Sequence, residues 1–244
     1  MLHRLGAGDR HAECAADQQE TTERRSCANA HALEGNSIAD GRRSHLDLRI
    51  AGVQRSTRMS RYADIQPATF IGGATGAFRV DRMVTVVGEA MPLVARLEVR
   101  AEATPSPSTE GAWSLRGVAG HARYVERLEK QALDASSPPL GRAEATRAAL
   151  IPIRKSPEWW ALPQDERRAI FEERSHHIAD TMKYLPRIAR RLYHSRDLGE
   201  PFDFLTWFEF APENAQAFED LVGMLRSREE WRFVDREVDI RLER

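Results

Sequence analysis

The chain of 244 residues contains only two cysteines, Cys14 and Cys27. Two thiols near the start cannot form a disulfide framework for a chain of this length, and no cysteine and histidine spacing typical of a zinc site occurs. Apolar runs stay well short of the roughly 18 residues that a membrane-spanning helix needs. The first residues lack the apolar core of a secretory signal. We therefore expect a cytoplasmic protein that does not enter the membrane.

Charge of one sign is also not in excess. The formal net charge is -1 at pH 7, so no overall electrostatic field draws the protein to nucleic acid or to an anionic membrane surface. Neither class of partner is expected.

Aromatic residues are missing from the first part of the chain. Residues 1–58 contain no Phe, Trp or Tyr, and all of these residues occur later. Such a segment cannot bury enough apolar surface to offset the entropy that it would lose on ordering. We interpret residues 1–58 as a disordered extension, or as misread upstream sequence before a true start at Met59. Residues 59–244 are then one folded domain.

Alternating apolar residues predict strands in the folded part. Residues 69–72 and 77–87, which are separated by glycines, suggest a β-hairpin. Residues 201–211 carry apolar side chains on both faces, which is typical of a strand that is covered on both sides. Further strands are predicted at residues 113–125, 146–153 and 231–242.

Three helices complete the prediction. A long one begins near Pro163 and reaches about residue 183, because proline and acidic residues suit a first helical turn. A short basic helix follows at residues 187–194, and a third covers residues 212–226. Helices on one side of a largely antiparallel sheet give an α+β fold of ferredoxin-like type.

Two adjacent histidines, His176 and His177, lie in the long predicted helix. His177 follows Ile170 by seven residues and shares its apolar stripe, whereas His176 is rotated from that stripe by about 100°. The spacing favours His177 as the functional histidine. On these residues alone, a hydrogen-bonded core histidine without a ligand is the alternative.

Five stretches resemble the chlorite dismutase family in sequence, order and separation. They are IPIRKSPEWWAL, ERSHHI, YLPRIARRLYHSRDL, FDFLTWFEFAP and REEWRFVDREVDIRL. The resemblance covers almost all of residues 59–244 and is to the short, dimeric branch. It implies a ferredoxin-like antiparallel β-barrel with helices packed outside, a homodimer, and haem b between barrel and helices. The implied reaction decomposes chlorite to chloride and dioxygen through ferryl haem and hypochlorite.

The same resemblance gives roles to individual residues. His177 matches the axial ligand of the haem iron, and Glu230 matches the carboxylate that accepts the other N–H of that histidine. Lys155 matches a lysine that keeps this glutamate ionised. Arg190 matches the one charged residue of the opposite face, where a fixed cation attracts chlorite and retains hypochlorite.

Six further residues match positions around the haem. Tyr124 is expected to reach a haem propionate with its hydroxyl group. His121 stands where we would expect an amide side chain. The others are two tryptophans beside the haem and two residues near the chlorite pocket: Trp159, Trp160, Thr206 and Phe208.

Two other functions remain open. Coproheme decarboxylases share the fold, but typically carry a residue other than arginine at the position of Arg190 and a reactive tyrosine before the tryptophan pair. Residues 146–155 contain no tyrosine. A haem carrier or sensor without catalysis is the second alternative, and only a chlorite dismutase would release oxygen from chlorite.

Overall fold

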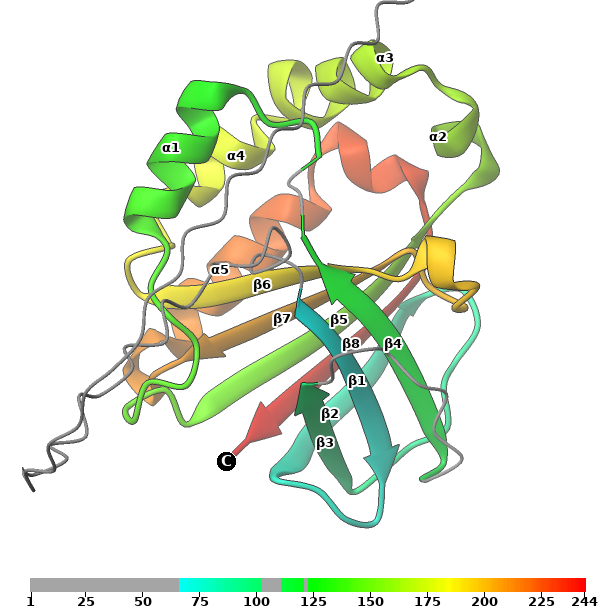
Figure 1. Ribbon diagram of the computed structural model, residues 1–244, viewed down its shortest axis with the longest axis vertical. Helices are drawn as coiled ribbons and strands as arrows, with labels where there is room; N and C mark the ends of the chain where they lie inside the picture. Colours follow the sequence, from blue (N-terminus) through cyan, green and yellow to red (C-terminus); the bar gives the residue numbers. More distant parts are fainter. Residues whose placement is uncertain (1–65, 102–110, 121–122) are drawn as a thin grey trace, which may run out of the picture. The chain divides into compact units, whose positions relative to one another are not determined.

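The computed structural model describes residues 66–101, 111–120 and 123–244 (Figure 1). The interpretation of residues 1–58 and the prediction for His121 fall outside these described residues.

Eight antiparallel strands of the described chain close into a barrel, in the order β1-β3-β2-β8-β5-β7-β6-β4. The mixed architecture and the antiparallel barrel expected from the resemblance are therefore confirmed. The strands are β1 (Gln66–Gly73), β2 (Phe78–Val87), β3 (Arg96–Ala101), β4 (Trp113–Ala119), β5 (Arg147–Lys155), β6 (Ile188–His194), β7 (Phe204–Phe210) and β8 (Val234–Glu243).

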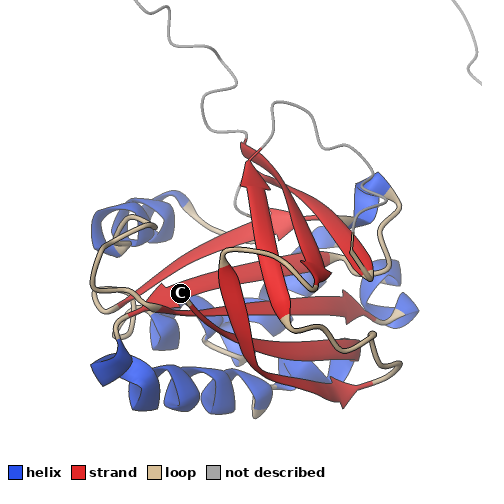
Figure 2. Ribbon diagram, turned by 90° about the horizontal axis from the view of Figure 1, so that it is seen from below, coloured by secondary structure: helices blue, strands red, loops and turns tan. Residues whose placement is uncertain are grey.

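The helical segments of the described chain gather over β5, β6 and β7, whereas β1, β2 and β3 have no such cover (Figures 1 and 2). The α-helices are α1 (Arg127–Ser136), α2 (Pro157–Ala161), α3 (Gln164–Arg168), α4 (His177–Thr181) and α5 (Ala215–Arg226). A π-helix, η1 (Ala169–Arg174), follows α3, and the short 3-10 segments are η2 (Arg196–Leu198), η3 (Pro212–Asn214) and η4 (Glu229–Phe233).

Strand β7 separates two apolar cores, as its alternating sequence predicts. Leu205 and Trp207 point into the barrel, where they pack with residues such as Phe70 and Ile240. Phe208 and Phe210 point outward and pack against Phe218 of α5, with ring centroids 5.0 and 4.5 Å apart. The two-sided cover fixes the register of β7, because a shift by one residue would exchange the two faces.

The predicted hairpin between residues 69–72 and 77–87 is wrong. Strand β3 lies between β1 and β2, so these two strands do not pair with each other. The glycines allow close approach rather than a tight turn. A Cβ atom at Gly72 would lie 2.2 Å from the Trp113 ring, and one at Gly76 would lie 2.5 Å from the backbone of Leu97.

The long predicted helix is interrupted. The chain runs as α3, then the π-helix η1, and then α4, and His176 between them has a left-handed backbone with φ of 52°. Local sequence is compatible with a continuous helix, but η1 packs against η4 where the path bends. His177 is half-buried and His176 is exposed, as expected if only His177 shares the apolar stripe.

The short basic helix predicted at residues 187–194 is also wrong, because this segment is strand β6. It pairs with β7 over seven residues and with β4 over two. These non-local hydrogen bonds override a local composition that favours a helix.

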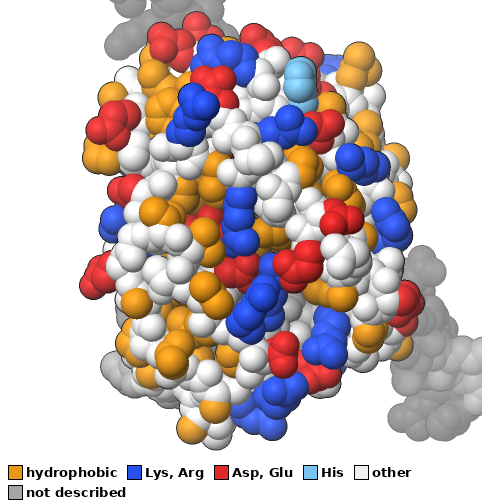
Figure 3. Space-filling model, turned by 180° about the vertical axis from the view of Figure 1, so that it is seen from behind, with side chains coloured by type: hydrophobic (Ala, Val, Ile, Leu, Met, Phe, Trp, Pro, Cys, Tyr) orange, Lys and Arg blue, Asp and Glu red, His pale blue; other side chains and the backbone are white. Residues whose placement is uncertain are grey.

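Charged side chains of both signs are interspersed over the face of the molecule seen in Figure 3. None of the helices in the described part of the chain combines the length and the apolar character needed to cross a bilayer.

A buried ionic network joins α5 to β8 behind the second core. Asp239 accepts hydrogen bonds from Arg226 at 2.8 Å and from Arg241 at 2.9 Å. Burial alone would raise the pKa of Asp239, but the hydrogen bonds and charge of Arg241, followed by those of Arg226, lower the pKa below the ordinary value of 3.8. The ionised carboxylate therefore stabilises the folded state.

This network predicts a specific acid sensitivity. Because the folded pKa of Asp239 is depressed, its contribution is complete above the unfolded pKa and is lost as the pH falls through the folded pKa. Asp239→Asn should lower the free energy of unfolding at neutral pH by about 1.5–3 kcal/mol. The same variant should show a shallower loss of stability in acid, measured by urea denaturation. Asp81→Asn, at an exposed ion pair, is the control. It should change neither the free energy of unfolding at neutral pH nor its loss in acid by more than about 1 kcal/mol. The prediction would be contradicted if Asp239→Asn and the unmodified protein lost stability equally as the pH falls.

Candidate functional site

A cavity of about 670 Å³ lies between the outer face of the barrel and the helices. Its volume falls within the range of about 300–1,000 Å³ that is typical of cofactor and ligand sites. Strands β5, β6 and β7 form one wall, and α1, α4 and α5 contribute to the other. Most of the side chains that shape it are apolar, among them Leu133, Ile151, Ile153, Ile178, Leu185, Ile188, Leu192, Phe208, Leu221 and Leu225.

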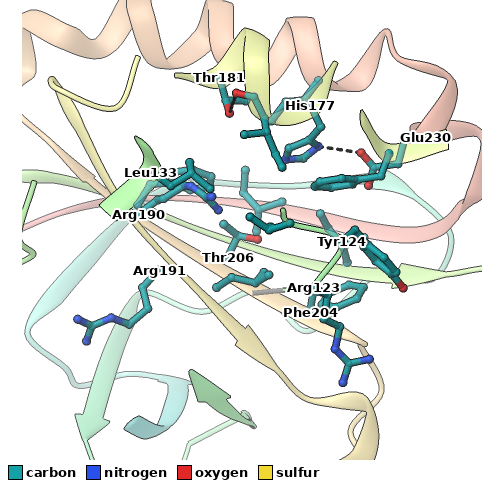
Figure 4. Close-up of a pocket in the computed structure, with 18 of the residues that line it drawn as sticks. Arg123, Tyr124, Leu133, His177, Thr181, Arg190, Arg191, Phe204, Thr206 and Glu230 are labelled. Atoms are coloured by element: carbon teal, nitrogen blue, oxygen red, sulfur yellow. Dashed lines mark hydrogen bonds and ion pairs between the residues drawn. The ribbon is translucent and has the colours of Figure 1, made fainter. Parts of the chain in front are cut away.

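One polar feature of the cavity is a histidine and carboxylate pair. His177 enters from the first residue of α4, and its Nδ1 lies 2.8 Å from Oε2 of Glu230 in η4 (Figure 4). A carboxylate partner selects the tautomer with hydrogen on Nδ1, which leaves the Nε2 lone pair available. The side chain of Glu230 is buried, with 6% of its surface exposed.

Lys155, the last residue of β5, completes this arrangement. Its Nζ donates to Oε1 of Glu230 at 2.8 Å and to the Glu230 carbonyl at 3.1 Å. Burial alone would raise the pKa of the Glu230 carboxyl, but the charge of Lys155, followed by that of His177, lowers the pKa to about 2. The carboxylate is thus held ionised beside the imidazole, which makes the imidazole more electron-rich.

The buried pair predicts a measurable coupling. Lys155→Met would leave the Glu230 carboxylate buried beside a methionine, and should lower the free energy of unfolding by about 3–5 kcal/mol. Glu230→Gln should also destabilise the protein, but the double variant should lose less than the sum of the two single losses. Chemical denaturation of all four proteins measures the coupling. Strictly additive losses would contradict a direct interaction.

Arg190 is a cation of the opposite wall. It lies on β6, and its side chain points into the cavity, as does Thr206 of β7 (Figure 4). The neighbouring Arg191 also borders the cavity, but its guanidinium is directed away from His177 (Figure 4). The Nε of Arg190 has no hydrogen-bond partner among the described residues. Burial lowers the pKa of the Arg190 guanidinium, yet an arginine keeps its charge in a protein. The cavity therefore contains a fixed positive charge without a neutralising carboxylate from the described chain.

The other predicted pocket residues divide into two groups. Trp159, Tyr124, Thr206 and Phe208 all line the cavity, although Phe208 also packs in the core against Phe218. Trp160 does not belong to this lining among the described residues. Its indole N–H donates to Asp203 at 3.0 Å, and its ring lies against the Arg196 guanidinium, 4.1 Å from the ring centroid. The two adjacent tryptophans thus point to different surroundings.

Tyr124 stands in the turn between β4 and α1, where its backbone has φ of 60°. Its hydroxyl oxygen accepts a hydrogen bond from Arg167 at 3.1 Å. That contact leaves the hydroxyl hydrogen available for a further acceptor. In Figure 4 the hydroxyl points away from His177 and Arg190, so Tyr124 lies at the edge of the site.

Sequence patterns did not identify several residues that shape this site. The ring of Phe171 in η1 stacks on the His177 imidazole with centroids 4.3 Å apart and an interplanar angle of 22°. Leu133 of α1 and Arg123 beside Tyr124 also line the cavity. Phe171 lies six positions before His177, a spacing that does not place two residues on the same face of a regular α-helix. The π-helix η1 changes the spacing, so sequence periodicity gave no signal for this contact. The apolar stripe of α1 is the one signal that could have indicated Leu133.

The residues present fit an iron porphyrin. A haem needs an axial nitrogen, apolar walls and an accessible opposite face, and His177, the aliphatic lining and Arg190 provide groups of these kinds. The indole Nε1 of Trp159 is buried without a hydrogen-bond partner in the described chain. A buried polar atom of this kind normally has a partner, and a haem carboxylate is one that the site could receive.

Comparison with known proteins gives a consistent assignment. Residues 71–242 match the chlorite dismutase family. The crystal structure of the dimeric chlorite dismutase from Nitrobacter winogradskyi is similar with a TM-score of 0.67 and 60% sequence identity, and the match covers 72% of this chain and 99% of that one. A chlorite dismutase variant from Candidatus Nitrospira defluvii shares the fold, with a TM-score of 0.51, 20% identity, and coverage of 73% of this chain and 91% of that chain.

A curated relative adds a shorter match. The chlorite dismutase of Ideonella dechloratans is 37% identical over 62 residues, which are 25% of this chain and about a fifth (20%) of that protein. Because the family match covers most of this chain and the Nitrobacter protein is matched along nearly its whole length, the chain belongs to the chlorite dismutase family.

Proposed function

We propose that this protein is a haem b enzyme that decomposes chlorite to chloride and dioxygen. The observation that carries the proposal is one apolar cavity lined by both a carboxylate-bound imidazole, His177, and a half-buried arginine, Arg190, whose buried Nε has no hydrogen-bond partner among the described residues. The reaction is balanced without a further substrate, because chlorite contains both oxygen atoms of the dioxygen and the chlorine atom of the chloride.

His177 would hold the haem iron through Nε2. Glu230 holds the Nδ1 hydrogen at 2.8 Å, so the imidazole cannot rotate away without losing a charge-assisted hydrogen bond. Lys155 keeps that carboxylate ionised, and the resulting electron-rich imidazole would favour the higher oxidation states of a bound haem iron. When bound, the haem supplies the redox chemistry that breaks the Cl–O bonds and forms the O–O bond.

Arg190 would act on the anions. Its charge attracts chlorite into an apolar cavity where electrostatic interactions are little screened by water. The same guanidinium would retain hypochlorite, the product of the first oxygen transfer, until the second oxygen atom has been transferred. Thr206 and Phe208 stand on the same wall, and the phenyl ring would help to exclude water.

Tyr124 and Trp159 would hold the edge of the haem. The Tyr124 hydroxyl can donate a hydrogen bond while it accepts one from Arg167, and a haem propionate is the acceptor that we propose. The Trp159 indole N–H has no other partner in the described residues. The assignment of Tyr124 predicts slower haem release from the unmodified protein than from Tyr124→Phe.

The test combines an absorption spectrum with an oxygen electrode. Purified protein loaded with haem b should show the spectrum of a histidine-bound ferric haem and release one dioxygen for each chlorite consumed. A haem spectrum without oxygen release would contradict the proposed reaction and leave a haem-binding protein. Absence of stable haem binding would contradict the cofactor assignment itself.

We further propose that each half of the barrel has a ferredoxin-like topology. In the second half the order is β8-β5-β7-β6, and helical segments connect β5 to β6 and β7 to β8. The first half repeats this arrangement as β4-β1-β3-β2, but with no helix assigned among its described residues. A duplicated unit with its first pair of helices lost would explain both orders.

We also propose that the protein is a homodimer, since the Nitrobacter winogradskyi relative is described as dimeric. Light scattering coupled to size-exclusion chromatography tests this directly. A mass equal to that of a single chain at micromolar concentration would contradict the proposal.

A further inference from the structure

His177 lies next to two irregular stretches of backbone. The π-helix η1 ends at Arg174, and His176 has φ of 52°, in the left-handed backbone region that residues other than glycine rarely adopt. A single residue in this region is unfavourable and persists only where its surroundings determine the conformation. Some contact must therefore hold the chain in this shape directly before His177.

Glu172 of η1 makes the contacts that bracket His177. Its carboxylate is buried, and Oε2 accepts a hydrogen bond from the Ile178 backbone N–H at 2.5 Å while Oε1 accepts one from the Ala179 N–H at 3.1 Å. The Glu172 carbonyl also accepts from the His176 N–H at 2.8 Å. One residue thus binds the backbone on both sides of His177.

The carboxylate satisfies backbone groups that α4 leaves without partners. The first N–H groups of a helix have no partner within the helix, and a carboxylate there forms charge-assisted hydrogen bonds. Since α4 begins at His177 itself, these bonds determine the direction in which the helix presents that imidazole.

Other contacts tie the same turn to the segment that carries Glu230. The Ser175 hydroxyl oxygen accepts from the Glu230 backbone N–H at 3.1 Å, and Asp180 forms an ion pair with Arg228. The segments of His177 and Glu230 are therefore joined on both sides of the pair. Within this arrangement Glu172 is the residue that fixes the start of α4.

We propose that Glu172 is a positioning residue for the axial histidine. By holding the Ile178 and Ala179 N–H groups, its carboxylate keeps the His177 imidazole aligned between Glu230 and the cavity. The proposal rests on the proposed haem ligation, and it assigns to Glu172 a role in ligand geometry beyond the stability of the fold.

Glu172→Gln is the matched substitution, because it preserves size but replaces one acceptor oxygen with an NH₂ group that faces a backbone N–H. In the haem-free protein, the Ile178 and Ala179 amides should exchange hydrogen at least about tenfold faster, since each bond to a charged acceptor is lost or weakened. In the haem-loaded variant, the iron–histidine stretching band of the ferrous form should shift or broaden, and haem should dissociate at least about tenfold faster. Glu173→Gln, at the exposed neighbouring position, is the control and should match the unmodified protein in all three measurements.

The outcomes separate the two proposals. An unchanged iron–histidine band and haem dissociation rate in Glu172→Gln would overturn the positioning role, even if the thermal midpoint falls, because a lower midpoint alone means that Glu172 only stabilises the fold. Failure of the unmodified protein to bind haem would instead remove the proposed function. In that case, unchanged amide exchange in Glu172→Gln would also overturn the proposed role of the Glu172 hydrogen bonds to Ile178 and Ala179. Faster exchange would retain Glu172 as the residue that orients His177 in the haem-free protein.

Discussion

Replacing His177 with alanine should abolish stable haem binding. The substitution removes the nitrogen that we assign to the iron and leaves the Glu230 carboxylate, which has the depressed pKa of about 2, without its imidazole partner. Loss of groups that merely orient a ligand typically weakens metal binding by about 10- to 100-fold, so loss of the ligand itself should exceed about 100-fold. Titration of haem into the purified variant, followed by absorbance, measures the change.

His176→Asn is the control for this experiment. Asparagine tolerates the left-handed backbone that His176 adopts, and the exposed side chain at this position has no part in the proposed site. Haem binding should therefore be unchanged. If His177→Ala is folded, added imidazole should partly restore haem binding and the absorbance spectrum of an imidazole-bound haem. Normal haem retention in His177→Ala together with haem loss in His176→Asn would reverse the assignment of the ligand.

Replacing Arg190 with alanine should suppress oxygen release from chlorite without removing the haem. The guanidinium is the fixed cation that we assign to the anions in the cavity, and loss of one preorganised electrostatic group typically lowers catalysis by about 10²- to 10³-fold. We expect a decrease of this size in kcat/KM, measured with an oxygen electrode. Hypochlorite that is no longer retained should also bleach the haem absorbance faster during turnover.

Two further variants make the Arg190 experiment specific. Arg190→Lys keeps the charge but loses the planar arrangement of donors, so its activity should lie between those of Arg190→Ala and the unmodified protein. Arg187→Ala removes an exposed arginine that precedes β6 and should leave oxygen release unchanged. Oxygen release at the unmodified level in Arg190→Ala would exclude the proposed role of Arg190.

Segment 187–194 shows where local sequence was insufficient. Its arginine, alanine and leucine residues favour a helix, yet it forms β6 because β7 supplies hydrogen-bond partners along its full length. Strand alternation then directs Arg190 into the cavity, while Tyr193 faces the barrel core. The predicted helix would not have placed Arg190 on the same wall of the cavity as Thr206, because that placement depends on the pairing of β6 with β7.

The break before His177 is a second example. The spacing of seven residues from Ile170 predicted a shared helical face, and both side chains do face inward. The intervening chain is not a regular helix, however, since η1 and the left-handed His176 separate the two residues. Glu172 holds this turn, and the periodicity of apolar residues in the sequence gave no signal for it.

The sequence by itself determined the family, the strand with two apolar faces at β7 and the residue types of the site, because these depend on motifs and on alternation over short stretches. Only the tertiary structure decided which residues meet. Glu230 lies 53 positions from His177 and 75 from Lys155. Pairing of β5 with β8 brings Lys155 close to η4, and the packing of η1 against η4 brings His177 close as well. It also decided that Trp159 borders the cavity while Trp160 turns toward Asp203 and Arg196. Those choices depend on pairing between distant strands and on the burial of charge, which no local window of residues contains.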